Sequence, residues 1–265
     1  MREESGVHMR SYDGYVGVFD SGLGGTSVLA ALVRELPGES FVFFGDSAHN
    51  PYGEKTPNEV LRLSRNITGG LLRAGCKAIV IACNTATSAA AETLRREHPD
   101  VPIIGVEPAL KPAVLAAQGG RVLVMATPMT VRLDKFQHLM QTWGDEAEVI
   151  AVPCEGLAAR IEHGDLDSPD LLDLLHSLVG AYEGLVDAVV LGCTHYPFVR
   201  EQIRAVLGDV AFFDGAQGTA RQLRRRLAEC GLLREDGEAQ GDVVFCSSDK
   251  TPQVVESYRR FFALA

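Results

Sequence analysis

Short apolar runs of four to six residues alternate along the chain with longer stretches that mix apolar and polar residues. The runs are rich in Val, Ile and Phe, and they lack the strict alternation of a strand that has one face in water. This pattern is typical of strands that are buried on both faces of a parallel sheet. We expect nine strands, at residues 16–19, 41–44, 78–82, 103–106, 121–126, 148–152, 188–192, 210–213 and 242–246.

Helical patterns fill the gaps between these strands, and residues 57–74 are a clear case. Thr56 can cap this helix, Pro57 suits its first position, and Glu59 stands three residues after the cap. Leucine and isoleucine then recur at roughly helical spacing. Because strands and helices alternate over the whole chain, the sequence predicts an α/β fold with parallel strands.

Two pairs of segments share a pattern at nearly the same offset. AIVIACNTAT, residues 78–87, aligns with AVVLGCTHYP, residues 188–197, and VFDSG, residues 18–22, aligns with VMATP, residues 124–128. In the first pair, an apolar strand ends on a small residue, a cysteine and two polar residues. The similar offsets indicate two related α/β halves. Convergent chemistry at strand ends is the alternative.

The composition is that of a soluble globular protein, because 46% of the 265 residues are hydrophobic and 23% are charged. The length fits one large domain or two small ones. No apolar run approaches the length of a membrane span, and the polar residues 1–15 lack the apolar core of a signal peptide. We therefore expect a cytoplasmic protein without membrane association, and disorder over residues 1–15.

The formal net charge of −10 disfavours a nucleic-acid partner, because such proteins usually present a basic face. One basic cluster is present in RQLRRRLAEC, residues 221–230, with arginines at 221, 224, 225 and 226. Their spacing fits the solvated side of an amphipathic helix, and an anion or partner site is the alternative.

Six cysteines, at positions 76, 83, 154, 193, 230 and 246, include no CxxC pair. A zinc ribbon or a thioredoxin-type motif is therefore disfavoured. Because nothing marks the chain as secreted, we expect free thiols. Cys76, Cys230 and Cys246 stand in apolar or helical surroundings typical of packing residues, whereas the role of Cys154, after a proline in AVPCEG, stays open.

Polar loops follow five of the predicted strands. Ligands of open parallel sheets bind beyond the carboxyl ends of the strands, so these loops are the predicted site. All are rich in glycine, hydroxyl groups and small polar residues. They read DSGLGG (20–25), GDSAHNPYG (45–53), CNTATS (83–88), TPMT (127–130) and CTHYP (193–197).

The first loop could cradle an anion on its backbone N–H groups. It does not match the dinucleotide fingerprint, because Ser27 stands where the last glycine belongs, and it lacks the Gly-Lys-Ser/Thr of a P-loop. Asp20 would repel a phosphate but could accept from an ammonium group. Asp20 together with the loop amides therefore fits a zwitterion better than a phosphate, and a plain tight turn is the alternative.

Cys83 and Cys193 each end a predicted strand, where the next residues can open a helix. Thiolate is the reactive form of cysteine, and helix N-termini and cationic neighbours lower the thiol pKa from about 8.5. A buried structural cysteine is the alternative at either position, but two thiols in matching contexts favour shared chemistry. If the two halves face each other, the thiols converge on one cleft from opposite sides.

Two opposed thiols suit inversion at a carbon acid, in which one group removes a proton from one face of Cα and the other delivers a proton to the opposite face. As an imidazolium, His195 could help to form the Cys193 thiolate, and Asp20 could play a matching role near Cys83. A cysteine hydrolase is an alternative, but it needs only one thiol and leaves the second unexplained.

Taken in order, DSGLGG, GDSAHNPYGEKT, CNTATS, GVEPA, ATPMTV and LGCTHYP resemble the motifs of the glutamate racemases, from about Val16 to the C-terminal region. The resemblance implies an enzyme that interconverts L- and D-glutamate without pyridoxal phosphate or metal. It also implies two flavodoxin-like, doubly wound parallel-sheet domains related by pseudo-two-fold symmetry, with the active site in the cleft between them. Residues 1–96 plus 208–265 would form one domain, and residues 97–207 the other.

By the same resemblance, Cys83 and Cys193 are the two acid/base residues, the first acting on the D-isomer and the second on the L-isomer. Asp20 and His195 match the groups that assist the thiols, and Glu162, in ARIEHGD, matches a further acidic helper. The positions that match substrate contacts are Asp20, Ser21, Tyr52, Gly53, Asn84, Thr85, Thr127, Thr194 and His195.

The resemblance further implies a homodimer that supplies D-glutamate for peptidoglycan. Two features depart from the family pattern: Gly215 instead of serine follows Asp214, which argues against a substrate role there, and residues 48–50 vary. The alternatives are a racemase for aspartate or another amino acid, and a flavodoxin-like amino-acid-binding module with inert thiols.

Overall fold

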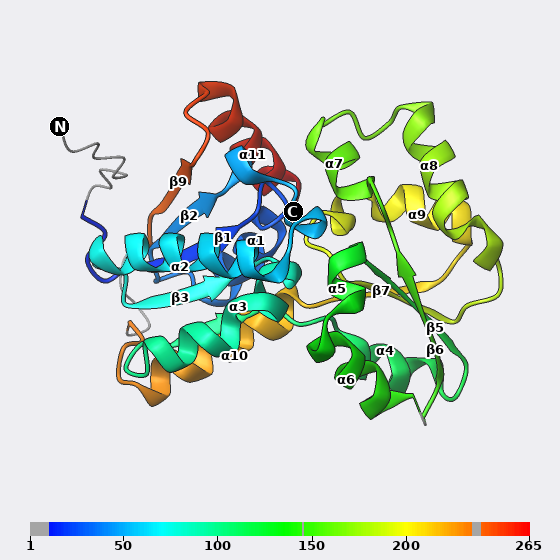
Figure 1. The fold of residues 1–265 in the computed structure, drawn as a ribbon, viewed down its shortest axis with the longest axis horizontal. Coiled ribbons are helices and arrows are strands. Elements are labelled where there is room, and N and C mark those ends of the chain that lie inside the picture. The colour runs from blue at the N-terminus through cyan, green and yellow to red at the C-terminus, as the bar shows by residue number, and fades with distance from the viewer. Residues whose placement is uncertain (1–10, 145, 235–239) are drawn as a thin grey trace.

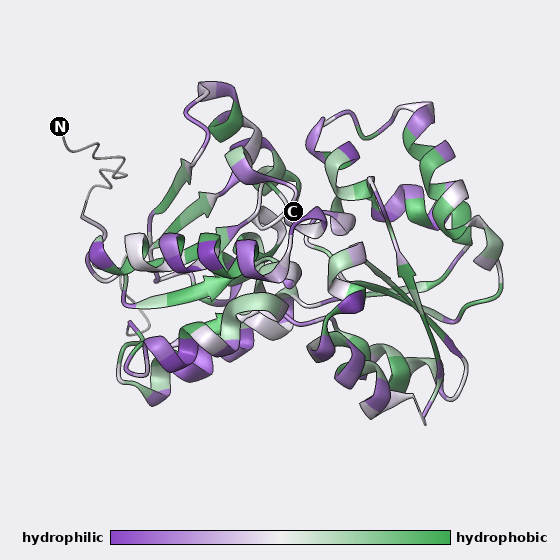
Figure 2. Cartoon of the chain, in the orientation of Figure 1, coloured by the Kyte–Doolittle hydropathy of each residue, from purple (hydrophilic) through white to green (hydrophobic). Residues whose placement is uncertain are grey.

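Two parallel sheets, each covered by helices, form two lobes that lie side by side (Figure 1). The computed structural model of the protein describes residues 11–144, 146–234 and 240–265. The predicted α/β class is confirmed, and all nine predicted strands are present with ends within one residue of the expected positions. The strands are mostly apolar, as Figure 2 shows, because those inside each sheet are buried on both faces.

The first sheet has five strands in the order β4-β3-β1-β2-β9. Its central strand, β1, pairs in parallel with β2 and β3. The strands are β1 (Val16–Asp20), β2 (Phe41–Gly45), β3 (Ala78–Ile81), β4 (Ile103–Gly105) and β9 (Val243–Ser247). Helices α1 (Thr26–Glu35), α10 (Ala216–Glu229) and α11 (Pro252–Leu264) cover one face, and α2 (Pro57–Arg73) and α3 (Asn84–Glu97) cover the other.

The second sheet has four strands in the order β6-β5-β7-β8. These are β5 (Arg121–Ala126), β6 (Glu148–Pro153), β7 (Ala188–Leu191) and β8 (Ala211–Asp214). Its helices are α4 (Leu110–Ala117), α5 (Pro128–Arg132), α6 (Asp134–Trp143), α7 (Leu157–Glu162), α8 (Pro169–Val179) and α9 (Arg200–Leu207). One apolar cluster includes side chains of both lobes, so the lobes share a continuous core.

The strand order repeats between the lobes. Read from the edge, β4-β3-β1-β2 of the first sheet corresponds to β8-β7-β5-β6 of the second. The end of β1 therefore corresponds to the end of β5, and the cysteine after β3 corresponds to the cysteine after β7. These are the two alignments seen in the sequence, so the topology supports two related halves.

Sheet membership differs from the predicted domain division at two strands. Strand β4 pairs with β3 in the first sheet, although residues 97–207 were assigned to the second domain. Strand β8 pairs with β7 in the second sheet, although residues 208–265 were assigned to the first. Edge-strand pairing is long-range, and the local pattern of an apolar run does not reveal its partner.

Local signals within the elements are largely confirmed. Helix α2 begins with a capping box, in which Thr56 Oγ1 accepts from Glu59 N (3.3 Å) and the Glu59 carboxylate accepts from Thr56 N (2.9 Å). The arginines at 221–226 lie on the exposed or half-exposed side of α10. No helix in the described part of the chain combines the length and apolarity needed to cross a bilayer.

Two expectations about the chain are wrong. Residues 11–15 are ordered: Tyr12 is buried, its ring contacts Tyr15, and Gly14 N donates to Gly75 O (3.1 Å). The rest of the stretch expected to be disordered, residues 1–10, lies outside the described residues. Cys230 is exposed instead of packed, because it caps the C-terminus of α10 on its solvated side. All six cysteines are free thiols, as expected.

Candidate active site

The loops after β1, β2, β3, β5 and β7 meet at a cavity between the two lobes. Eight of the predicted site residues line it directly: Ser21, Tyr52, Gly53, Asn84, Thr85, Thr127, Thr194 and His195. Both predicted acid/base residues, Cys83 and Cys193, also line it, one from each sheet. The free volume is about 30 Å³, room for about two water molecules.

Cys83 is the N-cap residue of α3. Its Sγ accepts from Ala86 N at 3.4 Å and lies 3.9 Å from Ser21 Oγ. Burial, with a smaller contribution from the nearby Asp20 carboxylate, raises the pKa of the Cys83 thiol to about 12. Cys83 is therefore a protonated thiol at neutral pH, suited to donate a proton.

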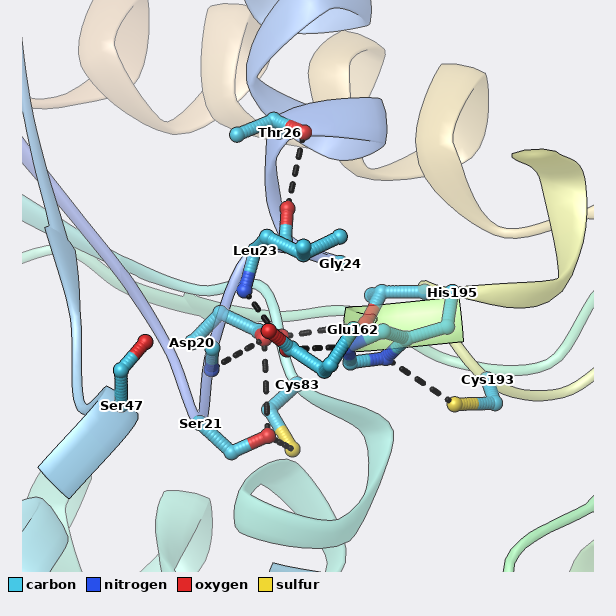
Figure 3. Close-up of polar contacts among 12 residues, drawn as sticks. Asp20, Ser21, Leu23, Gly24, Thr26, Ser47, Cys83, Glu162, Cys193 and His195 are labelled. Carbon is cyan, nitrogen blue, oxygen red and sulfur yellow. Dashed lines mark hydrogen bonds and ion pairs between the residues drawn. The ribbon is translucent and has the colours of Figure 1, made fainter. Parts of the chain in front are cut away.

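Cys193 has a different environment, because an imidazole and a carboxylate follow it in line (Figure 3). His195 Nδ1 lies 3.6 Å from Cys193 Sγ, and His195 Nε2 lies 2.7 Å from Glu162 Oε1. Burial by itself would lower the pKa of His195, but its contacts with Cys193 and Glu162 raise this pKa well above the ordinary value. An imidazolium donates from both nitrogens, which suits it to stabilise a Cys193 thiolate.

Glu162 thus lies where the sequence motif placed an acidic helper. Its Oε1 also accepts from Leu23 N at 2.9 Å, so one oxygen contacts both lobes. Glu162 does not line the cavity itself, and it contacts His195 at the ring nitrogen that does not face Cys193, as Figure 3 shows. Its effect on a substrate would therefore pass through the imidazole.

Asp20, fully buried at the end of β1, also lies just outside the cavity lining. One carboxylate oxygen accepts from Gly22 N (2.9 Å) and the other from Thr194 Oγ1 of the second lobe (3.1 Å). Burial raises the pKa of Asp20, and the charge of His195 opposes this rise. Asp20 therefore orients Thr194 of the second lobe and acts on the Cys83 thiol of the first.

The sequence suggests that Asp20 and the amides of the glycine loop 20–25 hold a zwitterion, but two of these amides have partners within the protein. The amides of Gly22 and Leu23 donate to Asp20 and Glu162 of the protein itself, so these two amides are not free for a substrate carboxylate. The glycines instead permit close packing of the lobes. A Cβ on Gly24 would lie 2.4 Å from His195 Nδ1.

Two further sets of hydrogen-bonded polar side chains contribute to the cavity lining, through Thr85 and Thr127 and through Tyr52. Thr85, Thr127 and Thr130 form a buried triangle of hydroxyls with oxygen–oxygen distances of 2.9 to 3.0 Å. Tyr52 donates its hydroxyl to Asp46 at 2.5 Å, and the same carboxylate contacts the exposed His49 at 2.8 Å. Burial raises the pKa of the Tyr52 hydroxyl, which remains protonated.

Sequence reasoning missed Asp46, Thr130 and Asn50 and left Cys154 open. Asp46 directly follows β2, much as Asp20 ends β1, and Thr130 stands about one helical turn after Thr127, so both carried a usable signal. Cys154 lines the cavity, and burial raises the pKa of its thiol to about 12. Asp214 lies outside this cavity and pairs with Arg200 at 2.9 Å.

No group of three or more His, Cys, Asp or Glu side chains within the described ranges could hold a metal ion. Among the described residues that line the cavity there is also no lysine, the residue that would bind pyridoxal phosphate as a Schiff base. The described lining offers thiols, hydroxyls, amides, one imidazole and the carboxylates of Glu54 and Glu155.

Comparison with known proteins identifies the family. The Asp/Glu/Hydantoin racemase model matches residues 16–223. The glutamate racemase of Clostridium perfringens (strain ATCC 13124) is 45% identical over 251 residues, which cover 94% of this chain and 96% of that protein.

Two solved structures agree with this assignment. Glutamate racemase from Thermus thermophilus, in complex with β-chloro-D-alanine, is 37% identical, with a TM-score of 0.77 and coverage of 94% and 93% of the two chains. Glutamate racemase from Francisella tularensis, in complex with D-glutamate, is 28% identical, with a TM-score of 0.81 and coverage of 95% and 94%. The resemblance seen in the motifs is therefore confirmed, and the chain belongs to the Asp/Glu/Hydantoin racemase family of isomerases.

Proposed function

We propose that this protein is a glutamate racemase that transfers protons to and from Cα through Cys83 and Cys193. One observation carries the proposal: the two thiols come from different sheets and line a single cavity. The names of the similar proteins support glutamate as the substrate. Thiols act as general acid and base when their pKa values approach the working pH or when a neighbour stabilises the thiolate.

The different environments of the two thiols support an assignment of which thiol acts on which isomer. The His195 imidazolium stabilises a Cys193 thiolate, which removes the Cα proton of L-glutamate. The protonated Cys83 delivers a proton to the opposite face, and D-glutamate results. For the reverse reaction the roles exchange, so Cys83 acts on the D-isomer. Glu162 holds His195 in its charged, donating state.

The remaining site residues hold the zwitterion. Hydroxyls, an amide and backbone groups contact the substrate carboxylates and ammonium group, and Asp20 supplies the negative charge behind them. We assign this role to Ser21, Tyr52, Gly53, Asn84, Thr85, Thr127 and Thr194. The reaction proceeds without pyridoxal phosphate, because the two thiols are sufficient for proton transfer and the described lining offers no lysine for a Schiff base.

The proposal extends to the setting of the enzyme. It acts in the cytoplasm as a homodimer and supplies D-glutamate for peptidoglycan synthesis, as the motif resemblance implies. Its domains follow the predicted division with one strand moved at each boundary, so that β1 to β4 with β9 form one domain and β5 to β8 the other.

The test is incubation with L-glutamate in D₂O, with L-aspartate in parallel. NMR measures exchange of the Cα proton, and circular dichroism measures loss of optical activity. We expect both for glutamate, and loss of racemisation in Cys83→Ala and in Cys193→Ala, each with a folded circular dichroism spectrum.

Cys76→Ala is the matched control, because Cys76 is also buried but lies outside the cavity. Full racemisation by either site variant would exclude the two-thiol mechanism. Activity on aspartate alone would change the substrate, and exchange of neither amino acid by the reduced, folded wild type would favour a binding module.

A further inference from the structure

Asn50 has an unused hydrogen-bonding atom at the cavity. It stands in the loop between β2 and α2 and lines the cavity together with Tyr52 and Gly53. Its side-chain Oδ1 is buried and has no hydrogen-bond partner. Asn50 belongs to the three loop residues that depart from the motif pattern of the family, so the motif comparison assigned it no role.

The orientation of the amide is explained by its surroundings. A Cβ added to Gly22 would lie 3.0 Å from Asn50 Nδ2 and 2.0 Å from Glu162 Oε1, so these two atoms lie close to the same point. The donor end of the amide thus faces an acidic group. This placement is the favourable one, because the opposite orientation would bring the Asn50 oxygen towards a carboxylate.

A buried carbonyl oxygen without a partner costs folding free energy, so native proteins rarely retain one unless a ligand or water pairs with it. Asn84 Oδ1, at a predicted substrate contact in the same cavity, has the same unpaired state. Both atoms are acceptors and need an N–H or O–H donor. At neutral pH the carboxylates of glutamate carry no proton, so its ammonium group is its only donor.

We infer that Asn50 is a further substrate-binding residue, whose Oδ1 accepts a hydrogen bond from the ammonium group of the amino acid. This inference rests on the proposed function, which supplies the amino-acid substrate. It makes Asn50 a determinant of specificity for the ammonium group, acting from the first lobe. The residue would distinguish amino acids from dicarboxylates of the same length.

The test compares Asn50→Ala with wild type, and Asn66→Ala is the matched control because Asn66 is exposed on α2. Calorimetry and inhibition of racemisation measure the affinities for D-glutamate and for glutarate, which has both carboxylates but no ammonium group. We expect Asn50→Ala to bind glutamate about 10- to 100-fold more weakly, the range for one hydrogen bond to a charged group. Affinity for glutarate is expected to stay within about twofold of wild type by the same reasoning.

A second measurement separates substrate binding from a structural role. Because Asn50 Oδ1 makes no hydrogen bond within the protein, Asn50→Ala without added ligand should melt at the wild-type temperature or above it. Unchanged glutamate affinity, equal losses for glutamate and glutarate, or a lower melting temperature of the ligand-free variant would each overturn the inference. Failure of the wild type to bind or racemise glutamate would instead count against the proposed function.

Discussion

The close packing of the glycine loop against His195 makes Gly24→Ala a sharp test of the site geometry. The added Cβ would lie 2.4 Å from His195 Nδ1, 2.6 Å from His195 Cε1 and 2.6 Å from Thr194 Oγ1. Ordinary contacts of this kind begin near 3.4 Å, so the imidazole or the loop must move by about 1 Å. Overpacking of this size costs about 1–3 kcal/mol of unfolding free energy.

The effect on activity should exceed the effect on stability. His195 contacts both Cys193 and Glu162, so a shift of the imidazole disturbs the group that stabilises the thiolate. A misplacement of about 1 Å near a reacting group can reduce the rate about 100-fold. We therefore expect Gly24→Ala to fold, to lose about 1–3 kcal/mol of stability, and to lose about two orders of magnitude in kcat/KM for L-glutamate.

Urea unfolding followed by circular dichroism measures the stability, and exchange of the Cα proton in D₂O measures the activity. Gly70→Ala is the control, because Gly70 lies within α2 and a Cβ there would meet nothing within 4 Å. Alanine at a helix-interior glycine should stabilise by about 0.5–1 kcal/mol and leave activity unchanged. Wild-type stability and activity in Gly24→Ala would refute the proposed contact between the lobes.

Two further predictions concern titration and thiol reactivity. Glu162→Gln removes one of the contacts that raise the pKa of His195, so the imidazolium should lose its proton at a lower pH. The alkaline limb of the pH profile of kcat/KM for L-glutamate should therefore move to lower pH. An unmoved limb would contradict the role of Glu162. A maleimide reagent should label the exposed Cys230 first, because burial raises the pKa of Cys76 and Cys83 to about 12 and shields both thiols. Peptide mass spectrometry measures the order of labelling, and faster labelling of Cys76 than of Cys230 would show that the described packing is wrong.

Much of the fold was readable from local sequence patterns. All nine strands lie within one residue of their predicted ends, because a strand covered on both faces must be apolar throughout. The capping residues of α2 likewise act within one turn of the helix, so Thr56 and Glu59 predicted its start correctly. The parallel alignments around Cys83 and Cys193 predicted their equivalent places in the two sheets.

The candidate site was predicted in part, because its residues follow strands whose ends gather at one edge of a parallel sheet. The contact of Glu162 with Leu23 spans 139 positions, and only the motif resemblance pointed to that glutamate. Asn50 was missed because an unpaired oxygen is a property of its surroundings and leaves no mark in the sequence.

The sequence by itself determined the class of fold, the strand and helix positions and the residue types at the strand ends, since these depend on local periodicity and hydrogen bonding. Only the tertiary structure decided which sheet receives β4 and β8, that Cys230 faces solvent, and that two loop amides serve the protein's own carboxylates. It also decided that His195, between Cys193 and Glu162, has a raised pKa. Pairing, burial and electrostatic environment depend on residues that are distant along the chain, and a pattern read over a few positions does not contain them.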